Sequence, residues 1–306
     1  MAISLVKVYV NGSWYNLTYN SSTGKYEGSI TAPGTTSYSQ PDHVYALQVQ
    51  AVNTAGTTVT VGVSDPTVGN SLKLRVLEKV KPTITITSPG GGSYVTNNKQ
   101  PIVFQLRDES GGSGINLSTL SLQIDSMTAV GSSSPGMVCN AVTNGYDCTY
   151  TPQSALSDGS HTVKINVSDN DGNAATQASR TYTVDTVPPT LNVTSPANNF
   201  ITNTATLTVQ GTTNDSTSSP VTITIKLNGV DQGAVTVSNG SFAKAVTLAN
   251  GSNTIVVTAT DAAGKSTTVT ITGTLDTSVP IIQSVTIVPN PVDAGATMLI
   301  SVEVLG

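Results

Sequence analysis

Short runs in which every second residue is apolar recur along the whole chain, and turn-forming residues separate them. In the clearest run, Val163, Ile165 and Val167 alternate with polar residues. Period-two alternation is typical of a strand with one face on a core and the other toward solvent. No window of a dozen residues keeps the apolar spacing of three and four that an amphipathic helix needs. The pattern therefore predicts an all-β chain.

One alternating strand occurs in three copies, and each copy ends in the same kind of turn. The turns begin at Asn53, Asp169 and Asp261, and each has the form Asx-x-x-Gly. The Asx side chain caps its own turn, and the glycine takes a positive φ at no steric cost. Copies so far apart indicate tandem domains rather than a solenoid of short units.

A second repeat signal marks the domain boundaries. Ser88-Pro89 and Ser195-Pro196 follow matching proline-containing junctions, and a third such junction ends near Pro280. We therefore expect a first repeat (residues 1–81), a second repeat (82–187), a third repeat (188–278) and a C-terminal segment (279–306). Many short strands separated by turns predict two packed sheets in each repeat.

The C-terminal segment is predicted to be a β-hairpin of two strands and a turn. A piece of this size buries too little surface to fold alone. We expect it to pack on a neighbouring unit, to pair with another chain as a docking segment, or to be a truncated module. The open edges of its strands could add to a sheet of another subunit.

Composition and charge exclude several classes of protein. Charged residues make up only 10% of the chain, the net charge is −5, and the 13 basic residues form no cluster. Nucleic-acid binding is therefore not expected. No apolar run approaches the roughly 18 residues that a membrane-spanning helix needs. The N-terminus has neither the basic region nor the long apolar region of a secretory signal. We therefore expect the chain to have an intact start and no signal peptide.

The two cysteines flank a predicted turn at Asn144-Gly145. A hairpin centred between Thr143 and Asn144 would place Cys139 directly opposite Cys148. A local disulfide is one interpretation, and two free thiols in a reducing compartment are the other. Two thiols without a nearby histidine do not make a zinc site.

Reactive constellations are not visible, and no enzymatic activity is expected. His43 and His161 lie in turns or at strand starts, and His161 has no histidine counterpart in the other copies. The exposed tyrosines could line a carbohydrate-binding face or simply pack across strands. These residues are Tyr15, Tyr19, Tyr26 and Tyr38.

The motif D-G-S-H-T-V-x-I-x-V-x-D-x-x-G-N, together with the junction V-D-T-x-x-P, resembles the bacterial immunoglobulin-like domains. These domains occur in tandem in surface adhesins and in phage tail and virion proteins. The resemblance covers residues 82–277. The first repeat and the end of the chain are similar to modules of prophage structural proteins. The resemblance to bacterial immunoglobulin-like domains implies an elongated rod of immunoglobulin-like β-sandwiches.

Calcium is the one ligand that the sequence suggests. Asp169 and Asp171 look like the start of a calcium loop, but the loop lacks a glutamate at its twelfth position. Tandem adhesin domains can hold calcium at their junctions, where Asp185 and Asp276 stand, and Asp261 repeats Asp169. Solvated turn carboxylates are the alternative interpretation of the same residues.

Three functions fit these observations. The first is a structural protein of a phage or prophage-like particle, a spacer and adhesion module on the tail, baseplate or virion surface. It would assemble in the host cytoplasm and oligomerise with other virion subunits through the C-terminal segment, with host glycans or proteins as further partners. The second is a bacterial cell-surface adhesin. The third is a carbohydrate-binding accessory array.

Overall fold

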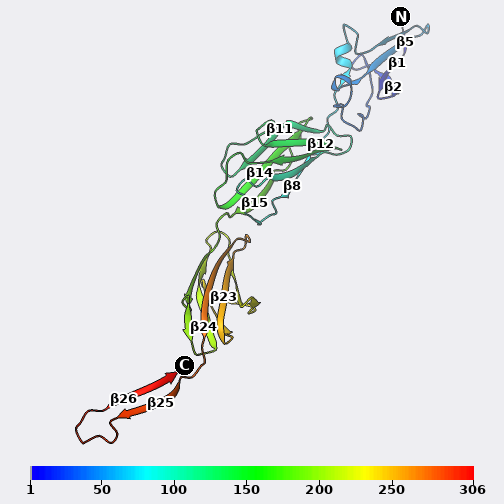
Figure 1. Cartoon of the computed structure of the whole chain (residues 1–306). Coiled ribbons are helices and arrows are strands. Elements are labelled where there is room, and N and C mark those ends of the chain that lie inside the picture. The colour runs from blue at the N-terminus through cyan, green and yellow to red at the C-terminus, as the bar shows by residue number, and fades with distance from the viewer. Residues whose placement is uncertain (1) are drawn as a thin grey trace. The chain divides into compact units, whose positions relative to one another are not determined.

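The computed structural model describes residues 2–306 and divides the chain into two compact units, Met1–Val184 and Asp185–Gly306. Both are built from β-strands, as the alternating pattern predicts (Figure 1). The helices of the described chain are two short 3₁₀ turns, η1 (Pro41–His43) and η2 (Gly69–Leu72). Neither provides a long apolar span of the kind that crosses a bilayer.

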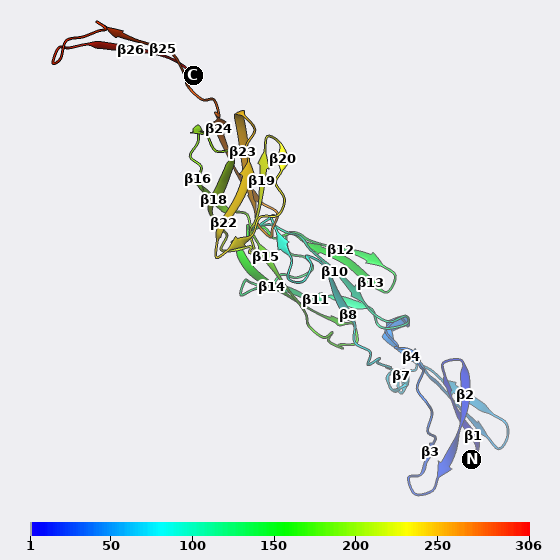
Figure 2. The same ribbon diagram turned by 90° about the horizontal axis from the view of Figure 1, so that it is seen from below.

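The first repeat has a five-stranded antiparallel sheet and a separate two-stranded ladder. The sheet order is β3-β2-β1-β5-β6, and Figure 2 shows β1, β2 and β3 side by side. Its strands are β1 (Ile3–Val10), β2 (Ser13–Asn20), β3 (Lys25–Glu27), β5 (Gln48–Asn53) and β6 (Thr58–Val61). The ladder consists of β4 (Tyr45–Ala46) and β7 (Lys73–Leu74).

Only one stripe of the five-stranded sheet is well buried. Val6, Val8 and Val10 alternate on the covered face of β1, with Tyr45 and Leu72 as further buried apolar residues. No residue of β2, β3 or β6 is buried, and β5 buries only Asn53. The first repeat therefore has a much smaller core than the sequence repeat suggests.

The second repeat is a sandwich of two four-stranded sheets, ordered β12-β13-β10-β8 and β11-β14-β15-β9. The strands of the first sheet are β8 (Thr83–Ser88), β10 (Ile102–Arg107), β12 (Met137–Val142) and β13 (Gly145–Tyr150). Those of the second are β9 (Tyr94–Val95), β11 (Ile115–Ile124), β14 (Gly159–Asp169) and β15 (Ala178–Val184). The first, second, fifth and fourth long strands share one sheet, which is the immunoglobulin arrangement.

The third repeat has the same topology, with sheets β16-β18-β22-β21 and β17-β24-β23-β19-β20. The strands of the first sheet are β16 (Thr190–Ser195), β18 (Thr206–Asn214), β21 (Val237–Ser238) and β22 (Ser241–Thr247). Those of the second are β17 (Phe200–Thr202), β19 (Thr222–Leu227), β20 (Val230–Asp231), β23 (Gly251–Thr260) and β24 (Ser266–Leu275).

Each of these two sandwiches encloses an aliphatic core. In the second repeat the predicted inward residues Val163, Ile165 and Val167 are buried against Phe104 and Tyr182. In the third repeat the corresponding residues of β23 are buried in the same way. Alternation on strands that face each other across two layers excludes water from the space between them.

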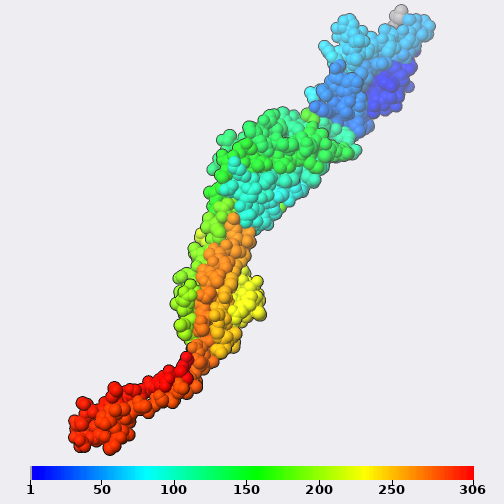
Figure 3. All heavy atoms as spheres, in the orientation of Figure 1, coloured from blue at the N-terminus to red at the C-terminus, as the bar shows by residue number. Residues whose placement is uncertain are grey.

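The C-terminal segment forms a separate antiparallel hairpin of β25 (Ile281–Val288) and β26 (Leu299–Leu305). All of its residues are exposed, and in Figure 3 its orange to red atoms carry no cover from other segments on the face in view. Cross-strand pairing puts six aliphatic side chains on one face: Ile282, Val285, Ile287, Ile300, Val302 and Val304.

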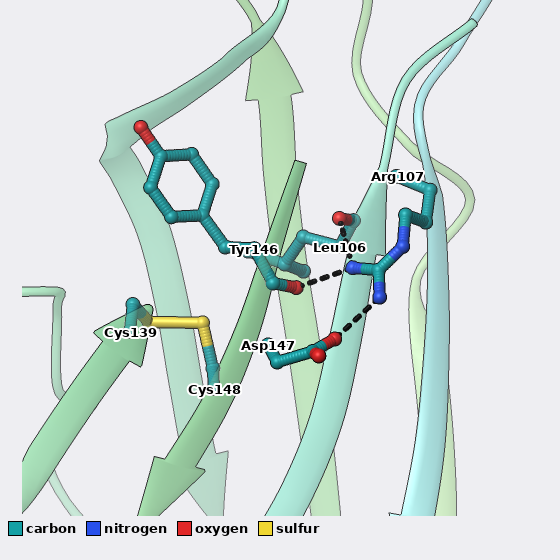
Figure 4. Close-up of a disulfide and its surroundings, with 6 residues drawn as sticks. All are labelled: Leu106, Arg107, Cys139, Tyr146, Asp147 and Cys148. Atoms are coloured by element: carbon teal, nitrogen blue, oxygen red, sulfur yellow. Dashed lines mark hydrogen bonds and ion pairs between the residues drawn. A yellow bond between two sulfur atoms is a disulfide. The ribbon is translucent and has the colours of Figure 1, made fainter. Parts of the chain in front are cut away.

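The structure joins Cys139 of β12 to Cys148 of β13 by a disulfide (Figure 4). The two residues are directly opposite in the register, and Gly145 lies opposite Val142 beside the turn. Cys148 is buried in the core of the second repeat. On the neighbouring strand Arg107 bonds to the Tyr146 carbonyl at 2.6 Å and to the Asp147 carboxylate.

Candidate metal centre

A cluster of carboxylates lies where the second repeat begins. Glu78 precedes β8, Asp108 follows β10, and Asp169 ends β14. One carboxylate oxygen from each residue lies within 4.8 Å of the others. The sandwich topology explains why the three carboxylates converge. β10 and β14 finish at the same end of the sandwich, beside the segment that leads into β8.

Backbone amides hold one oxygen of two of these carboxylates and leave the other oxygen unused. Asp108 Oδ2 accepts from Gly114 N at 2.7 Å, and one Glu78 oxygen accepts from Ser113 N. Asp108 Oδ1 and Glu78 Oε2 are buried without any hydrogen-bond partner. Asp108 is only 8% exposed. Buried carboxylate oxygens without donors are costly, and a cation would remove that cost.

A second cluster has the same construction at the start of the third repeat. Asp185 precedes β16, Asp215 follows β18, and Asp261 follows β23, again with oxygens within 4.8 Å of one another. Asp261 Oδ1 accepts from Lys265 N at 2.8 Å, whereas its Oδ2 is buried and unpartnered. Asp261 is 6% exposed, and Asp185 is fully buried.

The two clusters occupy equivalent positions of the repeat. The same sequence offset separates Glu78 from Asp185 and Asp108 from Asp215, and Asp169 corresponds to Asp261 through the repeated turn. Sequence reasoning named Asp169, Asp185 and Asp261 but missed the other three. The shared offset was the signal that could have found them. Two independent copies of one arrangement point to a common role.

Electrostatic repulsion is built into the first cluster. Burial raises the pKa of Asp108, and the neighbouring carboxylates of Glu78, Asp169 and Asp171 raise it further, while the Gly114 hydrogen bond opposes them. The ion pairs of the described chain are Arg107–Asp147 and His161–Asp125, so neither cluster has a basic partner there. Only a bound cation or a proton can offset this charge.

The donor set suits calcium. Hard divalent cations prefer carboxylate and carbonyl oxygens, and calcium tolerates irregular arrangements of six to eight of them. Glycine at position 112 leaves the space beside the carboxylates open. A Cβ on Gly112 would lie 2.7 Å from Asp108 Oδ2 and 2.9 Å from Glu78 Oε2. Both sites offer carboxylates only, without the nitrogen or sulfur ligands that zinc favours.

The other two aspartates predicted for calcium lie outside the clusters. Asp171 accepts a hydrogen bond from the Thr36 hydroxyl and another from Glu78 N at 3.1 Å, so it supports the first cluster from beside it. Asp276 is exposed, and hydrogen bonds from Ser278 lower the pKa of its carboxyl. Among residues 2–306, Asp276 belongs to neither of the two carboxylate clusters.

His161 is a buried residue whose two ring nitrogens both have polar partners, rather than a plain strand residue. Its Nδ1 lies 2.7 Å from Asp125 Oδ2, and its Nε2 lies 2.8 Å from the Ser157 carbonyl oxygen. Burial and Asp125 together raise the pKa of the neighbouring Tyr182 to about 12. His43 is exposed and stacks on Tyr38 with ring centroids 4.5 Å apart.

Three of the four tyrosines predicted from sequence fall on one sheet of the first repeat. Tyr15 and Tyr19 lie on the same face of β2, and Tyr19 is opposite Tyr26 with ring centroids 5.3 Å apart. Tyr38 lies in the loop before η1. Trp14 faces the other side of the sheet, and its role was not identified from the sequence.

Comparisons with known proteins agree with this topology. Residues 93–186 match the family model described as bacterial Ig-like domain, and residues 189–277 match the one described as glucodextranase, domain B. The prediction of tandem immunoglobulin-like domains is therefore confirmed for the second and third repeats. A comparison with curated proteins gave no match.

Several solved structures are similar to parts of the chain at low identity. The fibronectin(III)-like modules of Clostridium thermocellum CbhA are 18% identical, with a TM-score of 0.38, covering 63% of this chain and 94% of theirs. A 1.5-MDa bacterial ice-binding adhesin is 21% identical, with a TM-score of 0.30, 90% and 88% covered. Domains 3–5 of Drosophila OTK are 11% identical, with a TM-score of 0.27, 89% and 85% covered.

Proposed function

We propose that this chain is a non-enzymatic structural protein of a phage or prophage-like particle. It acts as a spacer and adhesion module whose second and third repeats are stabilised by calcium. The observation that carries the structural role is the pair of equivalent carboxylate clusters, one at the start of each complete sandwich. A cation there would tie the incoming chain to two strand ends of the domain that follows.

Several features support a place in an assembly. The hairpin of the C-terminal segment exposes six aliphatic side chains on one face, and its strands have free edges. Such a surface gains free energy when another β-sheet covers it. The first repeat and the chain end also resemble prophage structural modules. Other particle subunits are therefore the proposed partners of the hairpin.

A bacterial cell-surface adhesin is the second candidate. The disulfide between Cys139 and Cys148 suits any oxidising exterior and is compatible with both settings. Antibodies against the chain would separate the two candidates. Labelling of purified particles by immuno-electron microscopy supports the first, and labelling confined to the bacterial envelope would replace it with the second.

The calcium sites are tested by thermal unfolding of the full chain with calcium and with a chelator. Calcium at about 100 times its Kd should stabilise a repeat by about 2.7 kcal/mol. Asp108→Asn should remove the calcium response of the second repeat, and Asp215→Asn that of the third. Asp276→Asn is the matched control and should keep both responses. Equal unfolding with and without calcium would refute the sites.

The raised pKa of Asp108 predicts how the stability of the calcium-free chain depends on pH, which the same unfolding measurement can follow. In calcium-free buffer the folded chain holds this proton to a higher pH than the unfolded chain does. The resulting stabilisation is present below the unfolded pKa and is lost as pH rises through the folded value. Asp108→Asn should remove this loss, so without calcium at pH 7 the variant should be at least as stable as the parent. With calcium the order should reverse.

A further inference from the structure

The outward face of the first sheet carries an aromatic and amide-rich surface that the proposed calcium sites do not explain. The register places Tyr9 between Gln48 of β5 and Trp14 of β2. The next row on the same face has Lys7 between Gln50 and Asn16. These six residues form what we call the Trp14 face. It is opposite the face on which Val6, Val8 and Val10 are buried.

The aromatic groups of this face are fixed but remain open to solvent. The Tyr9 and Trp14 ring centroids are 5.3 Å apart, and Lys7 Nζ lies 4.7 Å from the Trp14 ring centroid. Trp14 is nevertheless 39% exposed. It is the single tryptophan of the chain, and its side chain contributes little to a core. An indole held in place by a strand pair and left exposed is well suited to stacking on a ligand.

Polar side chains surround the aromatic pair. Asn16 and Gln48 are exposed, and Gln50 Nε2 donates to Thr60 Oγ1 at 2.9 Å. Side-chain amides both donate and accept hydrogen bonds, as sugar hydroxyls do. The surface therefore combines an apolar ring with hydroxyl-binding groups, which is the chemistry of a carbohydrate rather than of an apolar peptide.

The charge of the first repeat indicates whether the carbohydrate is neutral or acidic. Residues 1–81 contain six Lys or Arg against four Asp or Glu, a net charge of +2, whereas residues 82–306 contain seven against fourteen, a net charge of −7. The first repeat is thus the basic part of an acidic chain. On its sheet the one acidic side chain, Glu27, is already engaged by Asn20 and Thr23, each at 2.8 Å. Lys7 stands at the centre of the Trp14 face.

We propose that the Trp14 face binds an acidic polysaccharide, one whose sugar units carry carboxylates. The C–H face of a sugar ring stacks on Trp14, its carboxylate pairs with the Lys7 ammonium, and its hydroxyls bond to Asn16 and Gln48. The proposal deepens the adhesion role proposed above by naming the ligand class, and it rests on that role.

Binding of the full chain to immobilised oligomers of galacturonic, glucuronic and sialic acid tests the proposal. The same oligomers with their carboxylates reduced to alcohols serve as neutral counterparts. We expect binding to at least one acidic oligomer, at least tenfold weaker binding to its reduced form, and weakening with added salt. Trp14→Ala and Lys7→Ala should each reduce affinity at least tenfold.

Tyr19→Ala is the matched control, because Tyr19 is an exposed aromatic on the opposite face of the same strand. It should bind like the parent chain. The proposal would be overturned if the parent chain bound no acidic oligomer. It would also be overturned if the Lys7 and Trp14 variants bound as tightly as the parent chain. The calcium response of each variant is measured in parallel. That response reports on the other repeats and keeps failure of the ligand distinct from failure of the calcium role. Hydrogen-exchange protection of β1 and β5 shows whether the first repeat itself stays folded in each variant.

Discussion

The contact between buried His161 of β14 and Asp125, which follows β11, should stabilise the second repeat by a measurable amount. Nδ1 of His161 faces a carboxylate, and Nε2 faces a carbonyl oxygen. These two contacts fix the ring between the end of β11 and the turn before β14. At the equivalent position of the third repeat the contact joins two amide side chains. Asn228 Nδ2 donates to Asn253 Oδ1 at 3.0 Å.

This equivalence supplies the perturbation. Asp125 and Asn228 both have positive φ, 50° and 51°. Each accepts a hydrogen bond from a backbone amide of the neighbouring strand in its sheet, Thr162 N of β14 and Thr254 N of β23. Asparagine therefore fits both positions without new backbone strain. The three variants are His161→Asn, Asp125→Asn and the double substitution.

The magnitude follows from burial. Leaving a buried polar group without its hydrogen-bond partner costs about 1–3 kcal/mol. His161 is buried, but the Asp125 side chain is 39% exposed, so solvent screens part of the interaction. We expect each single substitution to cost about 2 kcal/mol. The double substitution should cost at least 1 kcal/mol less than the sum of the two, because it restores an amide pair.

Hydrogen exchange in β14 and β15, followed across a urea series, reports the free energy of opening of this repeat alone. The first and third repeats provide the internal control and should not change. Single variants within about 0.5 kcal/mol of the parent, or strictly additive effects, would show that the pair is not coupled.

Two further predictions concern the disulfide and the hairpin. Replacing Cys139 and Cys148 together by Ala opens a loop of nine-residue separation, so the second repeat should lose about 2–3 kcal/mol in urea unfolding; a reductant should destabilise the parent equally and leave the variant unchanged. Val302→Asp should abolish association through the hairpin in analytical ultracentrifugation, whereas Ser301→Asp on the opposite face should not. Identical sedimentation of both variants and the parent at all concentrations would contradict a docking role.

Local sequence patterns predicted those parts of the molecule that depend on neighbours along the chain. The alternation of Val163, Ile165 and Val167 predicted a half-buried strand, and the Asn144-Gly145 turn predicted which residue would oppose Cys139. Both follow from the two-residue period of a strand and the geometry of a tight turn. The junction motifs likewise indicated tandem sandwiches, as the observed sheet topology of the second and third repeats shows.

The site depended on contacts that no local pattern contains. Asp169 and Asp261 read as turn residues in the sequence, which they are, since each caps its own turn. That Asp108 and Asp215 meet them is a consequence of strand order in two packed sheets. The same limit applied to His161, because its partner Asp125 ends a strand that is remote in sequence.

By itself, then, the sequence determined the strands, their inward faces, the turns and the disulfide register, because each depends on the backbone period and on residues a few positions apart. Only the tertiary structure decided which carboxylates converge, which histidine is buried against a carboxylate, and how few residues of the first repeat are buried. Those properties depend on the distances between strand ends and on the exclusion of water between layers, which arise once the sheets have packed.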